Sequence, residues 1–347
     1  LMEFLQLLMN FFVLMIEMEQ NIFINASILP TENLVNRIQN LSENKALFIN
    51  DEPLAFFAKE DEEVDFKTFD VLEYTCDDIL RIENTWDIFK LNGEAIKRDF
   101  KLLTTDRESQ LIPEMTVAFN KNQIFIEEGA VLPLCSLNAN DGPIYIGKDS
   151  EIMEGSMIRG PFALCENATI KMGAKIYGAT TIGPHSKVGG EVNNCVIFGY
   201  SNKGHDGFLG NSVVGEWCNI GADTNNSNLK NNYAEVRLWD YETEGFAKTG
   251  LQFCGLMMGD HSKCGINTMF NTGTVIGVSA NIFGSGFPRN FIPSFSWGGS
   301  AGMITYKTNK AFEVAEVVMS RRDIAFTEVD VQILEHVFEE TSKWRKG

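Results

Sequence analysis

The chain has 347 residues, of which 44% are hydrophobic, so it is long enough for two or three domains with sizeable cores. Its formal net charge of -18 would repel a nucleic-acid backbone or an anionic lipid surface, and we therefore expect no nucleic acid and no membrane as partner. The seven cysteines form no C-x-x-C pair, which argues against a disulfide framework or a zinc cluster and favours small apolar packing groups in a reducing cytoplasm.

The first twenty residues are strongly apolar. They lack a basic leader and a small-residue cleavage site, so we expect a buried helix rather than a signal peptide or a membrane span. The chain begins with Leu1 rather than Met, as expected of a fragment or a misassigned start. Four polar residues interrupt the apolar run: Glu3, Gln6, Asn10 and Glu17.

Residues 20 to about 105 have the pattern of a small α/β domain. Short runs rich in β-branched and aromatic residues predict strands at 21–29 and 45–51, and the apolar spacing between them predicts a helix at 32–42. The segment 85–103 predicts a helix that connects this domain to the next part of the chain.

Internal repeats identify the central part of the chain. From Ile146 onward an aliphatic residue returns at every sixth position, whereas an α-helix would return after three or four residues and a strand after two. A period of six is typical of a triangular parallel solenoid, and we expect it to extend from about 124 to 288. The residues predicted to point into the prism are Ile146, Ile152, Ile158, Leu164, Ile170, Ile176, Ile182 and Val188, then, after a shift of phase, Val196, Phe208, Val214, Ile220, Met258, Cys264, Phe270, Ile276 and Ile282.

Two further segments follow from this pattern. The polar stretch 223–249 interrupts the repeat and is too long for a corner, so it should form a loop that leaves the solenoid. Its apolar residues argue against simple disorder. After the repeats, a Phe- and Pro-rich stretch should lead into two capping helices, the second opened by a capping box of Thr327 and Asp330.

Of four histidines, His205 is the candidate catalytic residue. It lies where the repeat is irregular and glycines open space around it, whereas His185, His261 and His336 fit structural positions. Acyl transfer from a thioester needs a base with a pKa near neutrality and donors for the developing oxyanion. An imidazole suits the first role.

The segment 203–210 with the following Asn219-Ile220-Gly221-Ala222 resembles the acetyltransferase half of the bifunctional enzyme that makes UDP-N-acetylglucosamine. From about residue 22 onward the chain also resembles bacterial sugar nucleotidyltransferase-like proteins, also called glucose-1-phosphate thymidylyltransferase-like proteins. The motifs that carry this resemblance are WDIFKLNGEAIKRDF, GPIYIGKDSEIMEG, RGPFALCENATIKMGAKIYGATTIGP and FGYSNKGHDGFLGNSVVGEWCNIGADTNNSNLKNNYAEV.

The resemblance implies a left-handed parallel β-helix and a homotrimer with acetyl-CoA, or another acyl-CoA, in a groove between two β-helices. His205 would be the base, Gly221 and Ala222 would offer backbone contacts to the coenzyme, and no metal is expected in this site. Phe208 stands where the family has a tyrosine, and Asp223 where it has a glycine. The residues implied to bind the sugar phosphate or nucleotide sugar are Lys203, Phe208, Asn219, Asn228 and Lys230.

Three alternatives stay open. A sugar-1-phosphate nucleotidyltransferase, with Mg²⁺ in its N-terminal domain, would need a G-x-G-T-x-M loop for phosphates, and the sequence contains none. A zinc hydratase would need a close histidine pair and a third histidine at repeat spacing, and the histidines are too dispersed. A non-catalytic trimeric scaffold would need no coenzyme groove.

We therefore expect an α/β N-terminal domain, an all-β left-handed parallel β-helix of hexapeptide repeats, and C-terminal α-helices. The expected boundaries are 1–105 for a partial or degenerate nucleotidyltransferase-like domain and its linker helix, 106–290 for the β-helix with its inserted loop, and 291–347 for the helical cap.

Overall fold

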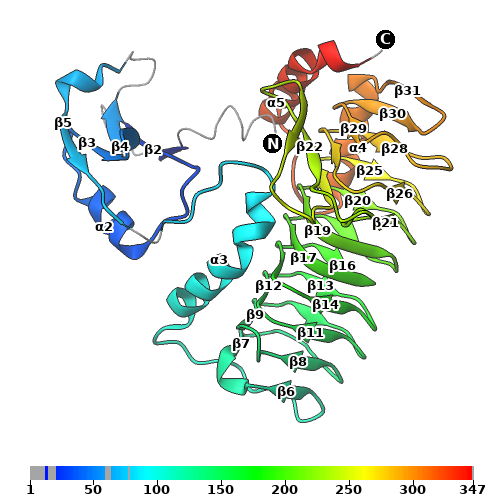
Figure 1. The fold of residues 1–347 in the computed structure, drawn as a ribbon. Coiled ribbons are helices and arrows are strands. Elements are labelled where there is room, and N and C mark those ends of the chain that lie inside the picture. Colours follow the sequence, from blue (N-terminus) through cyan, green and yellow to red (C-terminus); the bar gives the residue numbers. More distant parts are fainter. Residues whose placement is uncertain (1–11, 15–20, 59–63, 77–78, 346–347) are drawn as a thin grey trace. The chain divides into compact units, whose positions relative to one another are not determined.

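The computed structural model describes residues 12–14, 21–58, 64–76 and 79–345 (Figure 1). The chain divides between Asn84 and Thr85 into two compact units, and each is described by itself. The linker helix, which we expected to accompany the N-terminal domain, thus belongs to the compact unit of the β-helix.

The N-terminal unit is a five-stranded sheet with strand order β1-β2-β4-β3-β5. The strands expected at 21–29 and 45–51 and the helix between them are confirmed, and Thr31 caps that helix by accepting a hydrogen bond from Leu34 N. The expected helix at 1–20 is wrong at residues 12–14, which form a strand, and its remainder lies outside the described residues. The elements are β1 (Phe12–Leu14), β2 (Asn21–Ile24), α2 (Glu32–Gln39), β3 (Lys45–Ile49), β4 (Glu52–Ala58), η1 (Phe66–Thr68) and β5 (Asp70–Glu73).

The second unit is a parallel β-helix, as expected, with the strands stacked in flat faces (Figure 1). Ile152 pairs with Ile170, Ile158 with Ile176, and Leu164 with Ile182, which is the predicted eighteen-residue coil. These inward residues are almost fully buried and form one continuous aliphatic core. The expected fold class is confirmed.

One face of the prism is a nine-stranded sheet. Its strands in spatial order are β10 (Glu151–Ile152), β13 (Thr169–Ile170), β16 (Lys187–Val188), β18 (Asn202–Lys203), β20 (Asn219–Ile220), β25 (Lys263–Cys264), β28 (Asn281–Ile282), β30 (Ser296–Gly299) and the antiparallel β31 (Gly302–Thr305).

The other two faces are joined into a thirteen-stranded sheet, because β17 (Glu191–Ile197) and β19 (Phe208–Val214) are long enough to turn a corner. A short pair, β21 (Asn225–Asn226) with β26 (Met269–Phe270), adds two more strands to the solenoid. The other strands of the large sheet are β6 (Val117–Phe119), β7 (Ile124–Ile126), β8 (Ser136–Asn138), β9 (Ile144–Ile146), β11 (Met157–Arg159), β12 (Phe162–Leu164), β14 (Lys175–Tyr177), β15 (Thr180–Ile182), β24 (Leu256–Met258), β27 (Thr274–Ile276) and β29 (Phe291–Ile292).

The phase of the repeat shifts where the coils shorten. Val188 pairs with Lys203, only fifteen residues later, so the predicted inward residues Val196 and Phe208 are wrong by one position. Both are half-buried and face outward, and their neighbours Ile197 and Leu209 fill the core instead. The remaining predicted inward residues, from Val214 to Ile282, are buried as expected.

The inserted segment leaves the solenoid and carries a hairpin of β22 (Arg237–Asp240) and β23 (Gly245–Lys248). Its expected start at residue 223 is too early, because Asn225–Asn226 (β21) still pair with β26 in the solenoid. Val236 and Leu238 are fully buried, in a cluster with Trp86 and Phe89 on the outside of the β-helix. The insertion is therefore a packed element rather than a disordered loop.

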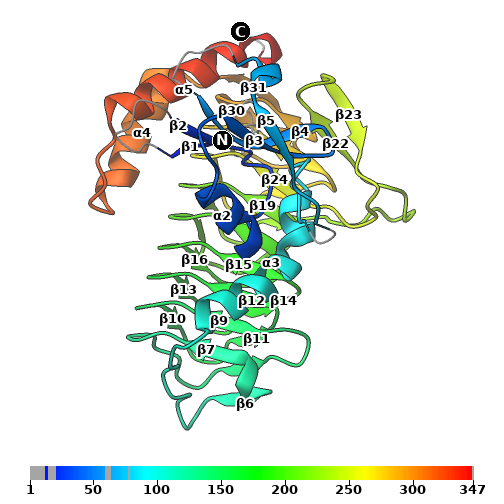
Figure 2. The same cartoon turned by 90° about the vertical axis from the view of Figure 1, so that its left-hand side faces the viewer.

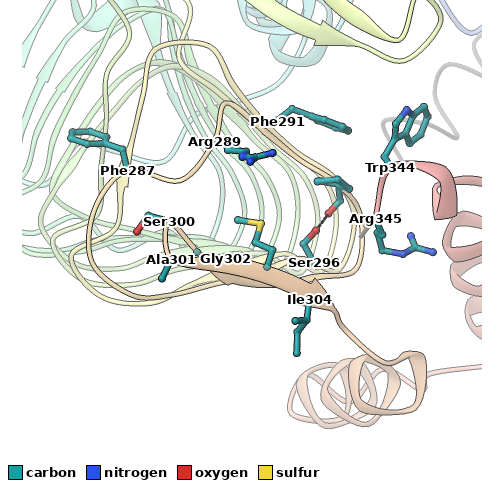
Figure 3. A pocket seen from close by; sticks show the side chains of 13 residues that line it. Phe287, Arg289, Phe291, Ser296, Ser300, Ala301, Gly302, Ile304, Trp344 and Arg345 are labelled. Carbon is teal, nitrogen blue, oxygen red and sulfur yellow. Dashed lines mark hydrogen bonds between the residues drawn. The ribbon is translucent and has the colours of Figure 1, made fainter. Parts of the chain in front are cut away.

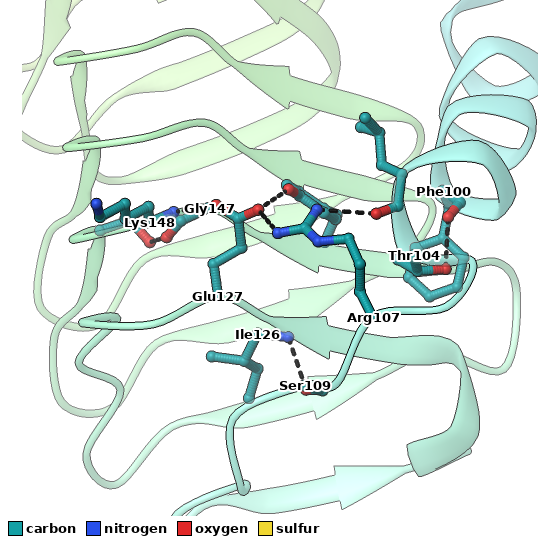
Figure 4. A network of polar contacts seen from close by, with 11 residues as sticks. Phe100, Thr104, Arg107, Ser109, Ile126, Glu127, Gly147 and Lys148 are labelled. Carbon is teal, nitrogen blue, oxygen red and sulfur yellow. Dashed lines mark hydrogen bonds and ion pairs between the residues drawn. The ribbon is translucent and has the colours of Figure 1, made fainter.

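Helix α3 (Asp87–Thr104) runs alongside the β-helix (Figure 2). Asn92 anchors it there, since its amide accepts a hydrogen bond from Thr181 Oγ1 at 2.8 Å and donates one to Ala179 O at 2.9 Å. Beyond the helix, Arg107 and Tyr145 both donate to Glu127 Oε1 at 2.5 Å and fasten the chain to the first coils (Figure 4). Burial alone would raise the pKa of Glu127, but these hydrogen bonds outweigh it and lower the pKa.

The β-helix extends further than expected. The stretch 287–299, expected to lead out of the solenoid, instead builds a last coil in which β29 and β30 pair with β27 and β28. The two capping helices follow as α4 (Thr308–Ser320) and α5 (Glu328–Glu340), with a short η3 (Ser342–Trp344), and the capping box of Thr327 and Asp330 is present. None of the described helices is long and apolar enough to cross a membrane.

Candidate functional site

His205 is exposed on a short turn at a corner of the prism. The turn joins β18, on the nine-stranded face, to β19, on the large sheet, so the imidazole lies between two faces. The turn is held from both sides, because His205 O accepts a hydrogen bond from Lys203 Nζ at 2.6 Å and Asp206 O accepts one from Asp223 N at 3.0 Å. Gly207 has a φ of +113°, and any side chain there would collide with Thr224 O, so this turn requires glycine.

Lys203 points into the prism rather than out of it. It pairs with Val188 in the inward column, only 2% of it is exposed, and its ammonium donates to the backbone of the His205 turn. Burial lowers the pKa of Lys203 to about 8, although the nearby carboxylates of Asp206 and Asp223 act in the opposite direction. The side chain is thus directed away from any ligand outside the prism, which does not fit the phosphate contact implied by the resemblance.

A second polar side chain lies inside the same coils. Asn226 is 4% exposed, accepts a hydrogen bond from Gly210 N at 2.9 Å and donates to Gly210 O at 3.1 Å. Its amide also reaches Ser212 Oγ at 3.3 Å. Buried polar groups with satisfied hydrogen bonds fix one local conformation, so the coil beneath His205 is more tightly specified than its aliphatic neighbours.

Phe208 and Asn228 lie side by side on the adjacent face. A Cβ atom on Gly210 would be 2.5 Å from the Phe208 ring and 2.7 Å from the Asn228 amide nitrogen, so both side chains occupy the space above Gly210. Asn228 donates to Asn211 Oδ1 at 2.8 Å, which orients its amide. The structure therefore brings together two of the residues implied to bind the acceptor.

Asn219 lies on the other side of the corner. It pairs with Asn202, three residues before His205, and lines a groove of about 560 Å³ on the nine-stranded face. Three residues span at most about 10 Å, so the Cα atoms of Asn202 and His205 lie within that distance of each other.

Gly221 and Ala222 follow directly after this face. Gly221 N donates to Cys264 O at 3.1 Å, which leaves it no amide hydrogen for a ligand. Ala222 is half-buried, and its carbonyl accepts a hydrogen bond from Asn267 N at 2.8 Å. Within the described part of the chain its own N–H makes no hydrogen bond, so of these two residues only Ala222 has an N–H that a ligand could use.

Lys230 lies elsewhere. Its Nζ donates to Glu235 O at 2.9 Å, and it lines a cavity of about 660 Å³ with residues of the inserted hairpin, among them Arg237 and Trp239.

A further cavity of about 420 Å³ lies at the last coil and is lined by Phe287, Arg289 and Trp344 (Figure 3). Four strand spacings, or about 19 Å, separate that coil from His205.

His185, His261 and the buried cysteines have structural positions. His185 and His261 belong to a column of stacked rings with Tyr200 and Trp217, whose centroids are 4.2 Å apart. Burial lowers the pKa of His261 to about 3 and raises the pKa of Cys195 to about 12. Among the described residues, no group of three metal-binding side chains is close enough to hold an ion.

Comparisons with known proteins support the expected resemblance. Residues 7–108 match the sugar nucleotidyl transferase family. The bifunctional protein GlmU of Methanocaldococcus jannaschii is 26% identical over 194 residues, which cover 55% of this chain and 40% of that protein. The bifunctional sugar-1-phosphate nucleotidylyltransferase/acetyltransferase of Sulfurisphaera tokodaii is 32% identical over 145 residues, 41% of this chain and 35% of that protein.

An uncharacterized acetyltransferase of Escherichia coli, YaiX, is 28% identical over 190 residues, 54% of this chain and 72% of that protein. The chain thus spans less than half the length of the two bifunctional relatives. The resemblance to nucleotidyltransferases and to bifunctional nucleotidyl- and acetyltransferases, which the motifs indicated, is confirmed, and the chain is related to transferases.

Proposed function

We propose that this protein is an acyltransferase that moves an acyl group, most simply acetyl, from acyl-CoA to a sugar phosphate or a nucleotide sugar. The observation that carries the proposal is the His205 turn, in which two hydrogen bonds fix the backbone that presents an exposed imidazole at a corner. The acetyltransferase names of the relatives support the same reaction class.

In this proposal the His205 imidazole accepts the proton of the acceptor hydroxyl or amine while that group attacks the thioester carbonyl. The tetrahedral oxyanion needs a donor, and the N–H of Ala222 is the candidate. When the intermediate collapses, the coenzyme thiolate leaves and takes the proton from the imidazolium, so protons balance and His205 returns to its neutral form.

The other residues of the site act on binding and position. Phe208 and Asn228 would form one side of the acceptor site, and Asn219 would contact a ligand on the opposite side of the corner. Lys203 is a positioning residue, because the only described hydrogen bond of its ammonium group goes to the backbone of the catalytic turn. We also propose a homotrimer with the coenzyme between two β-helices, which a measurement of molar mass in solution tests.

Substitution of His205 tests the assignment of the base. Because a general base contributes roughly 10²- to 10⁴-fold, His205→Ala should lower kcat by at least about 10²-fold and leave the thermal transition unchanged. His336→Ala is the matched control, since that histidine is also exposed but lies on α5. If His205→Ala turned over as fast as the wild type, the assignment would be wrong.

A second candidate function rests on residues 7–108, which match the sugar nucleotidyl transferase family. In that case the N-terminal unit would use a nucleoside triphosphate with Mg²⁺ to activate a sugar phosphate. Release of pyrophosphate from a nucleoside triphosphate and a sugar 1-phosphate tests it. A His205→Ala variant should not change that rate.

A further inference from the structure

The groove beside Asn219 is basic, although the protein as a whole is acidic. Its described lining holds four cationic side chains, Lys187, Lys263, Arg321 and Arg322, and no carboxylate. The chain contains 47 acidic and 29 basic residues, so a groove lined by cations alone is unexpected unless it binds an anion. We call these four residues, with Asn202 and Asn219, the basic groove.

The register of the β-helix builds one wall of the basic groove. Lys187 pairs with Asn202, Asn202 with Asn219, and Asn219 with Lys263, so four neighbouring strands present the outward order Lys, Asn, Asn, Lys. Three strand spacings place the two lysine Cα atoms about 14 Å apart, with the two amides between them. Lysine side chains from both ends can therefore converge on a ligand above the asparagines.

The end of α4 builds the opposite wall. Arg321 and Arg322 follow the last residue of this helix, and Val318 also lines the groove. None of the ion pairs within the described residues includes any of these four cations. Lys263 Nζ donates to His261 O at 2.8 Å, which leaves two of its three hydrogens for a ligand.

The size and composition of the groove fit a nucleotide. A volume of about 560 Å³ lies within the usual range for small-molecule sites. Guanidinium and ammonium groups bind phosphate oxygens through strong charge-assisted hydrogen bonds, and Tyr200 and Trp217 add aromatic surface to the lining. A diphosphate carries enough negative charge to engage cations on both walls at once.

We propose that the basic groove binds the diphosphate group of a nucleotide ligand. The proposal that the ligand is a nucleotide rests on the proposed function. In that reaction the acyl donor, which is a coenzyme A thioester, and an acceptor that is a nucleotide sugar both carry a diphosphate. The anion site itself does not depend on acyl transfer. His205 lies at the corner next to this face, so a nucleotide in the groove would present its other end to the imidazole.

Calorimetric titration of the full chain with coenzyme A, with UDP and with inorganic pyrophosphate tests the proposal. We expect saturable binding of at least one nucleotide and competition by pyrophosphate. Binding of coenzyme A without UDP would identify the coenzyme as the source of the diphosphate, and the reverse result would identify the nucleotide sugar. Absence of binding for all three probes would overturn the proposal.

A double variant locates the site. Arg321→Gln with Arg322→Gln should weaken nucleotide binding at least tenfold, because each arginine loses charge-assisted hydrogen bonds. Lys307→Gln with Lys310→Gln removes the same charge from the other end of α4 and should leave the affinity within about twofold. An equal loss of affinity in both double variants would overturn the ligand site and indicate a non-specific effect of positive charge. A change of oligomeric state in the arginine variant alone would overturn it too and indicate a contact between subunits.

The outcomes also separate this proposal from the proposed function. Nucleotide binding that depends on Arg321 and Arg322, without any acyl transfer, would contradict the acyltransferase and keep the groove. Acyl transfer with an unchanged KM in the arginine variant would contradict the groove and keep the acyltransferase.

Discussion

Replacement of the buried Lys203 by methionine should stabilise the fold while lowering activity. Lys203 occupies an inward position between Val188 and Ile220, where an apolar residue of the same length would fit. The fall of its pKa from the ordinary 10.5 to about 8 corresponds to a cost of roughly 3 kcal/mol for the charged form at neutral pH. Loss of the charged hydrogen bond to His205 O opposes this gain by about 1.5 to 3 kcal/mol.

The net expectation at pH 7 is a free energy of unfolding about 1 kcal/mol higher in Lys203→Met. Because the pKa is lower in the folded state, the unfolded state holds more protons between pH 8 and 10.5, and the wild type gains stability as the pH rises through that window. At about 1.4 kcal/mol per pH unit, the advantage of the variant should shrink above pH 8, vanish near about pH 9 and reverse at higher pH. Its kcat for acyl transfer should fall, since the His205 turn loses an anchor.

Denaturant unfolding at several pH values between 6.5 and 10 measures the effect, with Lys148→Met as the control because Lys148 is exposed. The control should show neither the gain nor its decline with pH. The reasoning would be refuted if Lys203→Met were less stable than the wild type by 1 kcal/mol or more at pH 7 and if its stability changed with pH as that of the wild type does.

Three further predictions concern stability. Glu127→Gln should lose the stability that depends on the lowered pKa of this carboxyl. The wild type should be more stable than the variant above about pH 4.5, and the difference should vanish as the pH falls through the folded-state pKa. Thermal unfolding between pH 3 and 7 measures this difference. His261→Phe keeps a ring against Trp217 and removes a buried group with a folded-state pKa of about 3. As the pH falls from 6.5 to 3, the variant should therefore lose less stability than the wild type. Curves of stability against pH that run parallel for the two proteins would contradict this. Leu238→Ala should cost about 2 to 5 kcal/mol if the inserted hairpin packs as described, and a cost below about 0.5 kcal/mol would show that it does not.

The inward positions from Ile146 to Val188 could be predicted because each coil there keeps eighteen residues and each inward residue is aliphatic. Val196 and Phe208 could not, because the coils shorten and a lysine takes an inward position, where a hydrophobic pattern gives no signal. The last coil was missed for a related reason, since its Phe- and Pro-rich residues do not keep the six-residue period.

The candidate site was predictable only in part. The resemblance identified His205, Phe208 and Asn228, which lie around one corner, but it also grouped them with Lys230, which lies in another cavity. The arginines of the basic groove follow α4, and no local pattern reveals which coil a terminal helix covers. Lys187 and Lys263 could have been found from the outward column of the repeat.

The most direct test of the acyltransferase is an assay with acetyl-CoA and a panel of sugar phosphates and nucleotide sugars, in which free thiol and acetylated acceptor are measured together. The account predicts equal amounts of both products with at least one acceptor, and a loss of both in His205→Ala. Absence of transfer to every acceptor, with pyrophosphate released from a nucleoside triphosphate instead, would contradict the account and identify the N-terminal unit as the catalytic part.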